Sequence, residues 1–136
     1  MGKLYFKDGS LMYDGDLKNG KPHGQGKMIY KYDTFNEEYI GEFRDGKKHG
    51  YGKEYCDLFH DYLAYEGEFQ EDKRHGNGKE YCMFMGSLEY EGEYINNNRD
   101  GKGETFYTSG SIREKGTFKG LELEDGQKFD SDGNLI

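Results

Sequence analysis

The sequence predicts an all-β protein in which tandem β-hairpin repeats stack into an elongated, twisted, single-layer antiparallel sheet. A glycine-containing pattern returns along the chain at near-constant intervals, and tyrosine and phenylalanine stand where most β proteins carry aliphatic residues. The chain has 22 glycines and 13 tyrosines, no valine, and a net charge of −8. Few aliphatic residues and a high charge would ordinarily indicate disorder. Glycines in register and large rings indicate instead a folded protein with an aromatic core.

The repeat opens with tyrosine, any residue, glycine, an acidic residue, and then an aromatic residue or leucine. Four such copies are followed by a Gly-x-Gly block whose first glycine comes nine residues after the opening glycine; a degenerate fifth copy starts at Glu114. Because side chains alternate along a strand, Tyr39, Gly41 and Phe43 should share one face of the sheet. The positions that we assign to the structure of the repeat are Tyr13, Gly15, Tyr39, Gly41, Phe43, Gly50, Gly52, Tyr65, Gly67, Phe69, Gly76, Gly78, Tyr90, Gly92, Tyr94, Gly101 and Gly103.

The two connections of each repeat differ. The constant nine-residue spacing indicates a fixed turn, and residues that tolerate a left-handed backbone occur there as Gly20, Gly46, Asp72 and Asn97. The other connection varies in length, and we expect tight hairpins at Gly9, Gly86, Gly110, Asp125-Gly126 and Asp132-Gly133. The chain is therefore divided as one domain, 1–136, with repeats at about 5–30, 31–56, 57–82 and 83–107, a degenerate repeat at 108–120, and a C-terminal hairpin or cap at 121–136.

These two blocks together resemble the MORN repeat, a short β-hairpin unit, and the resemblance covers roughly residues 5 to 120. The tryptophan usual after the acidic position is replaced by Leu17, Phe43, Phe69 or Tyr94, a departure that looks more like the bacterial members of the family. The resemblance implies contact with proteins, sometimes dimerisation, sometimes attachment to membrane phospholipids, and no catalysis by the repeats.

Repetition argues against catalytic or metal-binding roles. His23, His49 and His75 occupy one repeat position, so they should lie about 10 Å apart, too far to share a metal ion. Cys56 and Cys82 are equivalent in the same way, so we expect free thiols. We expect no cofactor, no metal and no enzymatic activity.

The fixed turns carry basic residues that stacking would align into a stripe. A lipid headgroup or an acidic partner would suit it, although a solvated rim that offsets the acidic repeat positions explains the same residues. The residues of this stripe are Lys21, Lys47, Lys48, Lys73, Arg74 and Arg99.

The variable loops carry aromatic residues at the opposite rim. Exposed rings in a row would form a protein-binding patch, whereas rings folded over the end of the sheet would complete its core. The residues of this aromatic rim are Phe35, Phe59, His60, Tyr62 and Phe84.

The sequence thus predicts a non-catalytic protein-interaction or scaffolding module, with phospholipid binding through the basic stripe as the alternative. A homodimer through a sheet edge or face is a further expectation, because an open sheet ends in unpaired strands. We expect no nucleic-acid partner. With no signal peptide or membrane span apparent and with free cysteines, the expected compartment is the cytoplasm.

Overall fold

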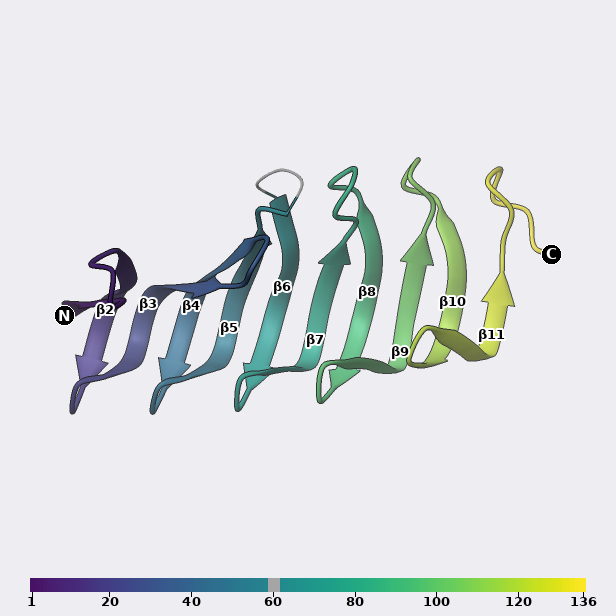
Figure 1. Cartoon of the computed structure of the whole chain (residues 1–136). Coiled ribbons are helices and arrows are strands. Elements are labelled where there is room, and N and C mark those ends of the chain that lie inside the picture. The colour runs from purple at the N-terminus through teal and green to yellow at the C-terminus, as the bar shows by residue number, and fades with distance from the viewer. Residues whose placement is uncertain (59–61) are drawn as a thin grey trace.

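The computed structural model describes residues 1–58 and 62–136, which form antiparallel strands and no helix. The strands are β1 (Gly2–Tyr5), β2 (Leu11–Lys18), β3 (Lys21–Lys31), β4 (Asn36–Arg44), β5 (Lys47–Cys56), β6 (Tyr62–Gln70), β7 (Lys73–Tyr81), β8 (Leu88–Ile95), β9 (Asn98–Phe106), β10 (Ile112–Lys119) and β11 (Glu122–Lys128). They pair in chain order into one 11-stranded sheet, a single layer with the two termini at opposite ends (Figure 1). The predicted all-β stack of hairpins is confirmed.

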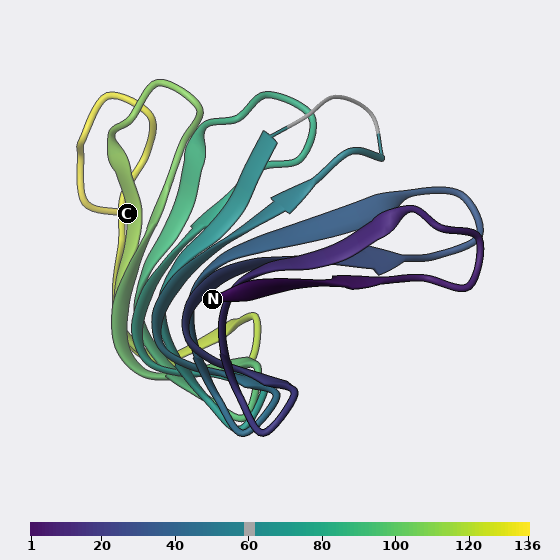
Figure 2. The same ribbon diagram turned by 90° about the vertical axis from the view of Figure 1, so that its left-hand side faces the viewer.

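One glycine from every strand lies in a row that crosses the whole sheet. Each member is the register partner of the next, from Gly2 at one edge to Gly126 at the other. The strands also bend sharply along their length (Figure 2). We call this set the glycine row; its members are Gly2, Gly15, Gly26, Gly41, Gly52, Gly67, Gly78, Gly92, Gly103, Gly116 and Gly126.

In the four repeats that open with tyrosine, the tyrosine ring rests on the glycine row, which leaves no room there for a side chain. A Cβ built on Gly52 would lie 2.2 Å from the hydroxyl oxygen of Tyr39, and one on Gly41 would lie 2.5 Å from the Cα of Gly52. The Tyr39 hydroxyl then donates a 2.9 Å hydrogen bond to the carbonyl of Glu42 on its own strand. The same packing recurs for Tyr13, Tyr65 and Tyr90.

The rings form a continuous column on one side of the sheet, which we call the inner face. Tyr39 contacts Phe43 within its repeat and Phe69 in the next, with both pairs edge-to-face and both centroid distances 5.0 Å. Edge-to-face pairs add about 1 kcal/mol each to the burial of the rings. The alternation is as predicted: Tyr39, Gly41 and Phe43 are buried, and Ile40 is exposed on the outer face.

The fixed turns place two successive residues in the left-handed region, as in a type I′ turn. Asp45 and Gly46 have φ of 50° and 86°, and Glu71 and Asp72 have 50° and 69°. In the third fixed turn, Asp72 stands in place of glycine, and its side chain forms an additional contact. Asp72 Oδ1 accepts a 2.8 Å hydrogen bond from the amide of Lys48 in the preceding repeat. The left-handed positions predicted from the spacing are confirmed.

The loop side confirms the tight turns at Gly9, Gly86 and Gly110, each with positive φ, and the turn at Gly133. The predicted turn at Asp125-Gly126 is wrong. Gly126 lies inside β11 and pairs with Gly116, because a glycine was needed to continue the row. The chain turns at Gly120 instead, so the fifth hairpin runs to Lys128.

Replacing Gly52 with alanine should destabilise the protein by about 3 kcal/mol or more, because the new methyl group cannot share the space of the Tyr39 ring. Urea denaturation followed by far-UV circular dichroism measures the effect. Gly20→Asn is the control: nothing lies within 4 Å of its Cβ position, and asparagine tolerates its φ of 77°. Equal losses in both variants would contradict the ring-over-glycine account.

Candidate binding surfaces

The acidic residue after each opening glycine holds the Gly-x-Gly block in place. Glu42 Oε2 accepts a 2.7 Å hydrogen bond from the amide of Tyr51, nine residues along the chain, and Asp16 accepts one of 3.0 Å from Gln25. Glu68 and Glu93 bind the amides of Asn77 and Lys102 in the same way. The constant spacing of nine therefore reflects this hydrogen bond, and these carboxylates have a structural use.

A chain of alternating charges crosses the inner face above the rings. Lys48 Nζ lies 2.8 Å from Glu54 Oε2, Arg74 Nε lies 3.0 Å from Glu54 Oε1, and Arg99 Nη2 lies 2.9 Å from Glu80 Oε2. Arg74 also approaches Glu80 at 4.0 Å, which joins the pairs into one network. We call these five residues the ion ladder.

Each cation of the ion ladder also lies on an aromatic ring. Lys48 Nζ is 4.7 Å from the centroid of Tyr30, and the guanidinium carbons of Arg74 and Arg99 are 4.4 and 4.6 Å from those of Tyr65 and Tyr90. Burial alone would raise the pKa of Glu54, but Lys48 and Arg74 outweigh it, so the pKa lies below its ordinary value. Paired charges thus cover the inner-face rings of Tyr30, Tyr65 and Tyr90.

Three of the six residues of the expected basic stripe lie on the inner face and not along the open rim of the fixed turns. Lys48 and Arg99 are each 8% exposed and Arg74 is half-buried, because alternation directs them onto the inner-face rings. Lys21, Lys47 and Lys73 are exposed, and Lys47 Nζ lies 3.1 Å from Glu71. The fixed turns therefore carry no continuous row of free cations.

The loop rim presents apolar side chains from consecutive loops. Phe84 and Met85 are each 68% exposed in the loop before β8. Phe35 is half-buried and stacks on Tyr32 with the ring centroids 4.8 Å apart, while Tyr62, the first residue of β6, is half-buried. Phe59 and His60 lie outside the described residues. The rim thus combines exposed side chains with rings that cover the end of the sheet.

A cavity of about 240 Å³ opens on the inner face beneath this rim. Phe35, Leu58 and Met83 come to it from three successive loops, and Cys56 and Ala64 contribute from β5 and β6. Its polar wall consists of Glu37, Glu54 and Arg74. The cavity brings together residues that are far apart in the chain. Of its lining, the sequence predicted Phe35 as part of the aromatic rim and Arg74 as part of the basic stripe.

Glu37 differs from the other inner-face carboxylates. Glu54 and Glu80 each bind two cations, whereas among the described residues Glu37 forms no ion pair. Burial raises the pKa of Glu37 above its ordinary value, and the charge of Glu54 raises it further. Lys48 and Arg74 act in the opposite direction without cancelling this effect.

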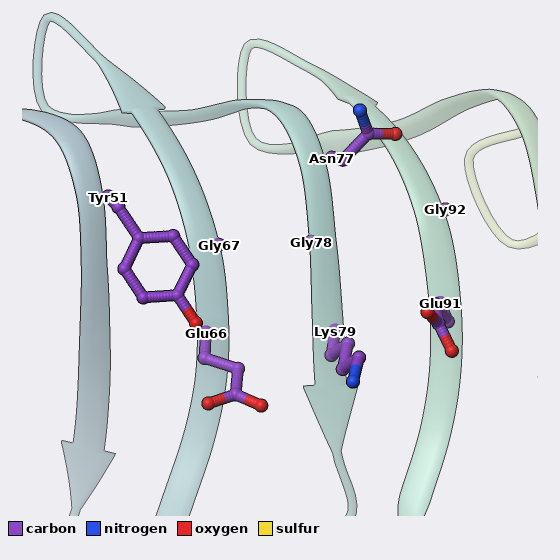
Figure 3. Close-up of a pocket in the computed structure, with 8 residues that line it drawn as sticks. All are labelled: Tyr51, Glu66, Gly67, Asn77, Gly78, Lys79, Glu91 and Gly92. Atoms are coloured by element: carbon purple, nitrogen blue, oxygen red, sulfur yellow. The ribbon is translucent and has the colours of Figure 1, made fainter.

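The outer face has a shallow trough over Gly67, Gly78 and Gly92 (Figure 3). Its floor is bare backbone, and the flanking side chains of Glu66, Lys79 and Glu91 alternate in charge. Glu66 already accepts a 2.8 Å hydrogen bond from the hydroxyl of Tyr81. The ring of Tyr51 stands at one side of the trough, and the other flanking side chains are polar or charged.

The histidines and cysteines occupy repeat positions. His23 Nδ1 accepts a 3.2 Å hydrogen bond from the amide of Asp45, in the fixed turn of the next repeat. Cys56 and Cys82 are free thiols. Within residues 1–58 and 62–136, no three His, Cys, Asp or Glu side chains are placed to hold a metal ion.

Comparison with known families matches the repeat unit directly. The MORN repeat profile aligns with residues 13–31, 39–57, 65–83 and 90–112, more than half of the chain. The chain belongs to the MORN-repeat family. Each matched segment of this MORN protein starts at the tyrosine that covers the glycine row. Among curated proteins, no sequence matches the chain.

MORN repeats are generally associated with modules that interact with proteins or membranes. In the part of this MORN chain that the structure describes, there is no helix both long and apolar enough to cross a bilayer.

Two inner-face carboxylates of this MORN protein were missed by the sequence reasoning. Glu54 and Glu80 each come two residues after a Gly-x-Gly block, where Met28 and Thr105 stand in the other repeats. Their recurrence opposite the basic positions at Lys48, Arg74 and Arg99 was a usable signal for an ion network. No comparable signal marked Glu37.

Replacing Glu54 with glutamine should cost about 3 kcal/mol at pH 7, because Lys48 and Arg74 would both lose their closest carboxylate on a largely buried surface. Since its pKa is lowered on folding, the carboxylate stabilises the protein above its ordinary pKa of 4.5, and this stabilisation is lost as the pH falls through the folded value. Urea denaturation at pH 7 and pH 3 should therefore show that the difference in free energy of unfolding between variant and wild type is smaller at pH 3. A constant difference would contradict this account.

Replacing Glu37 with glutamine should leave the protein as stable as wild type at pH 7, or more stable. Its pKa is raised on folding, so the wild type is relatively most stable below the ordinary pKa of 4.5 and loses that advantage as the pH rises through the folded value. Glutamine removes the penalty of the buried charge. Thermal denaturation at pH 7 checks this, and a large loss would mean that Glu37 has a stabilising partner.

Proposed function

We propose that this MORN chain is a non-catalytic protein-binding module whose docking surface is the loop rim. The observation that carries the proposal is the contrast between the two rims. The fixed turns are polar, with residues such as Asp45, Glu71 and Asn96 at their tips. The loops instead expose Phe84 and Met85 beside the cavity that Phe35 lines.

Apolar and methionine side chains at one edge of a charged molecule are typical of protein interfaces. Aromatic anchors surrounded by polar residues carry most of the binding free energy in such surfaces. Two sets of polar groups of the repeat are used within the fold: the acids after the row glycines bind amides, and the ion ladder pairs with itself. This supports a binding role for the rim and a scaffolding role for the repeat.

The net charge of −8 supports a basic partner, which the field of the protein would attract during encounter. The same charge disfavours approach to anionic membranes, and three cations of the expected basic stripe lie on the inner face. Dimerisation through the β1 or β11 edge remains a prediction, to be tested by light scattering.

The proposal is tested by affinity capture from the lysate of the source organism. Phe35→Ser/Phe84→Ser should lose a protein that the wild type recovers stoichiometrically, because truncating two aromatic anchors typically weakens binding by a hundredfold or more, about 3 kcal/mol. Ile40→Ser on the outer face is the control, since it also removes an exposed apolar side chain and should capture the partner normally.

Capture of the same protein by the rim variant, together with its loss in Ile40→Ser, would place binding on the outer face. Sedimentation with vesicles of anionic phospholipid tests the alternative function, phospholipid binding. Vesicle binding in the absence of any captured protein would contradict the proposal.

A further inference from the structure

Glu37 lines the cavity beneath the loop rim because the β3–β4 pair differs from the other hairpins that end at a loop. In the described strands, the β1–β2, β5–β6, β7–β8 and β9–β10 pairs each contain a register shift near the loop, and β3–β4 pairs without one from Gly24↔Phe43 to Lys31↔Asn36. Strand alternation therefore continues unbroken to the loop. It places Glu37 on the inner face with Tyr39, opposite Tyr30 and Cys56.

The adjacent Glu38 shows the usual position of a charged residue in this strand. It points to the outer face, where its carboxylate lies 3.5 Å from Lys27 Nζ. Glu37 instead points to a surface that elsewhere carries rings and paired charges. A half-buried carboxylate that forms no ion pair with the described residues is less favourably placed than Glu38, which singles out this position.

The other carboxylates of the inner face show which kind of group binds there. At Lys48, Arg74 and Arg99, a cation lies on an aromatic ring and binds a carboxylate. The cavity supplies two parts of that arrangement, the carboxylate of Glu37 and the aromatic residue Phe35. The third part of the arrangement is the cation. Among the described residues, none is paired with Glu37, because Lys48 and Arg74 are both bound to Glu54.

We propose that this cavity binds a lysine or arginine side chain of the partner protein, with Glu37 as its counter-ion and the apolar residues Phe35, Leu58 and Met83 along its methylene stem. The inference rests on the proposed protein-binding function and names the chemistry of its central contact. A long basic side chain matches both the apolar walls and the acidic end of the cavity.

The test uses the purified full chain, labelled with ¹⁵N, and capped pentapeptides with one variable residue between glycines. Peptides containing arginine or lysine should shift the amide resonances of residues that line the cavity, such as Glu37, Cys56 and Ala64. Citrulline and norleucine are the neutral counterparts of similar shape. They should bind about tenfold more weakly, because the charge-assisted contact is lost.

Glu37→Gln should weaken the arginine and lysine peptides by a similar factor, while its thermal stability shows that the fold is intact. Glu38→Gln is the matched control: it removes the same charge one residue away on the outer face and should bind as wild type does. Equal weakening in both variants would show a general field effect and overturn the proposal. Equal binding of norleucine and lysine would show an apolar pocket without cation recognition and would also overturn it.

The two proposals fail differently. If lysate capture recovers the same partner with wild type and Glu37→Gln, the rim binds proteins but the cationic contact is wrong. If the arginine peptide shifts cavity resonances in wild type and not in Glu37→Gln while capture recovers no protein, the cavity recognises cations and the protein-binding function is wrong.

Discussion

The packing of a tyrosine ring on a bare glycine backbone determines the rest of this structure. A single-layer sheet has no second layer to bury its side chains, so the inner face must exclude water with what one layer provides. Glycine at the crossing leaves room for the ring of Tyr39 against the backbone of Gly52. The strands also bend along their length (Figure 2). The rings of successive repeats then meet edge to face, and a chain without valine or tryptophan still has a continuous core.

The ion ladder covers the side of the rings that faces away from the sheet. A thin sheet leaves the upper surface of each ring near solvent, and a cation can cover that surface while its own charge is satisfied by a carboxylate. Arg74 does both, since it lies over Tyr65 and binds Glu54. The charges that make the sequence look unsuited to folding therefore form part of the inner layer, which is why charge and hydropathy alone describe this protein poorly.

The fold was predictable because its determinants repeat. The nine-residue spacing, the left-handed turn positions and the alternation about Gly41 all follow from local backbone geometry, which a periodic sequence displays several times. The turn predicted at Asp125-Gly126 was wrong because a hairpin turn and a position in the glycine row both favour glycine. Only the pairing of Gly126 with Gly116 shows that it belongs to the row. The binding surfaces were less predictable. The side on which Lys48 lies, and the exposure of Glu37 to a cavity shared by three loops, depend on strand register and on contacts between repeats.

The strictly sequential strand order also has a consequence for synthesis on the ribosome. Each strand pairs with the strand made just before it, so a hairpin can dock on the finished part of the sheet as soon as it emerges. No strand has to wait for a distant partner, and the exposed edge moves forward with the growing chain. The unpaired edges during synthesis are therefore only β1 and the newest strand, whereas folds with long-range pairing leave several strands unpaired at once.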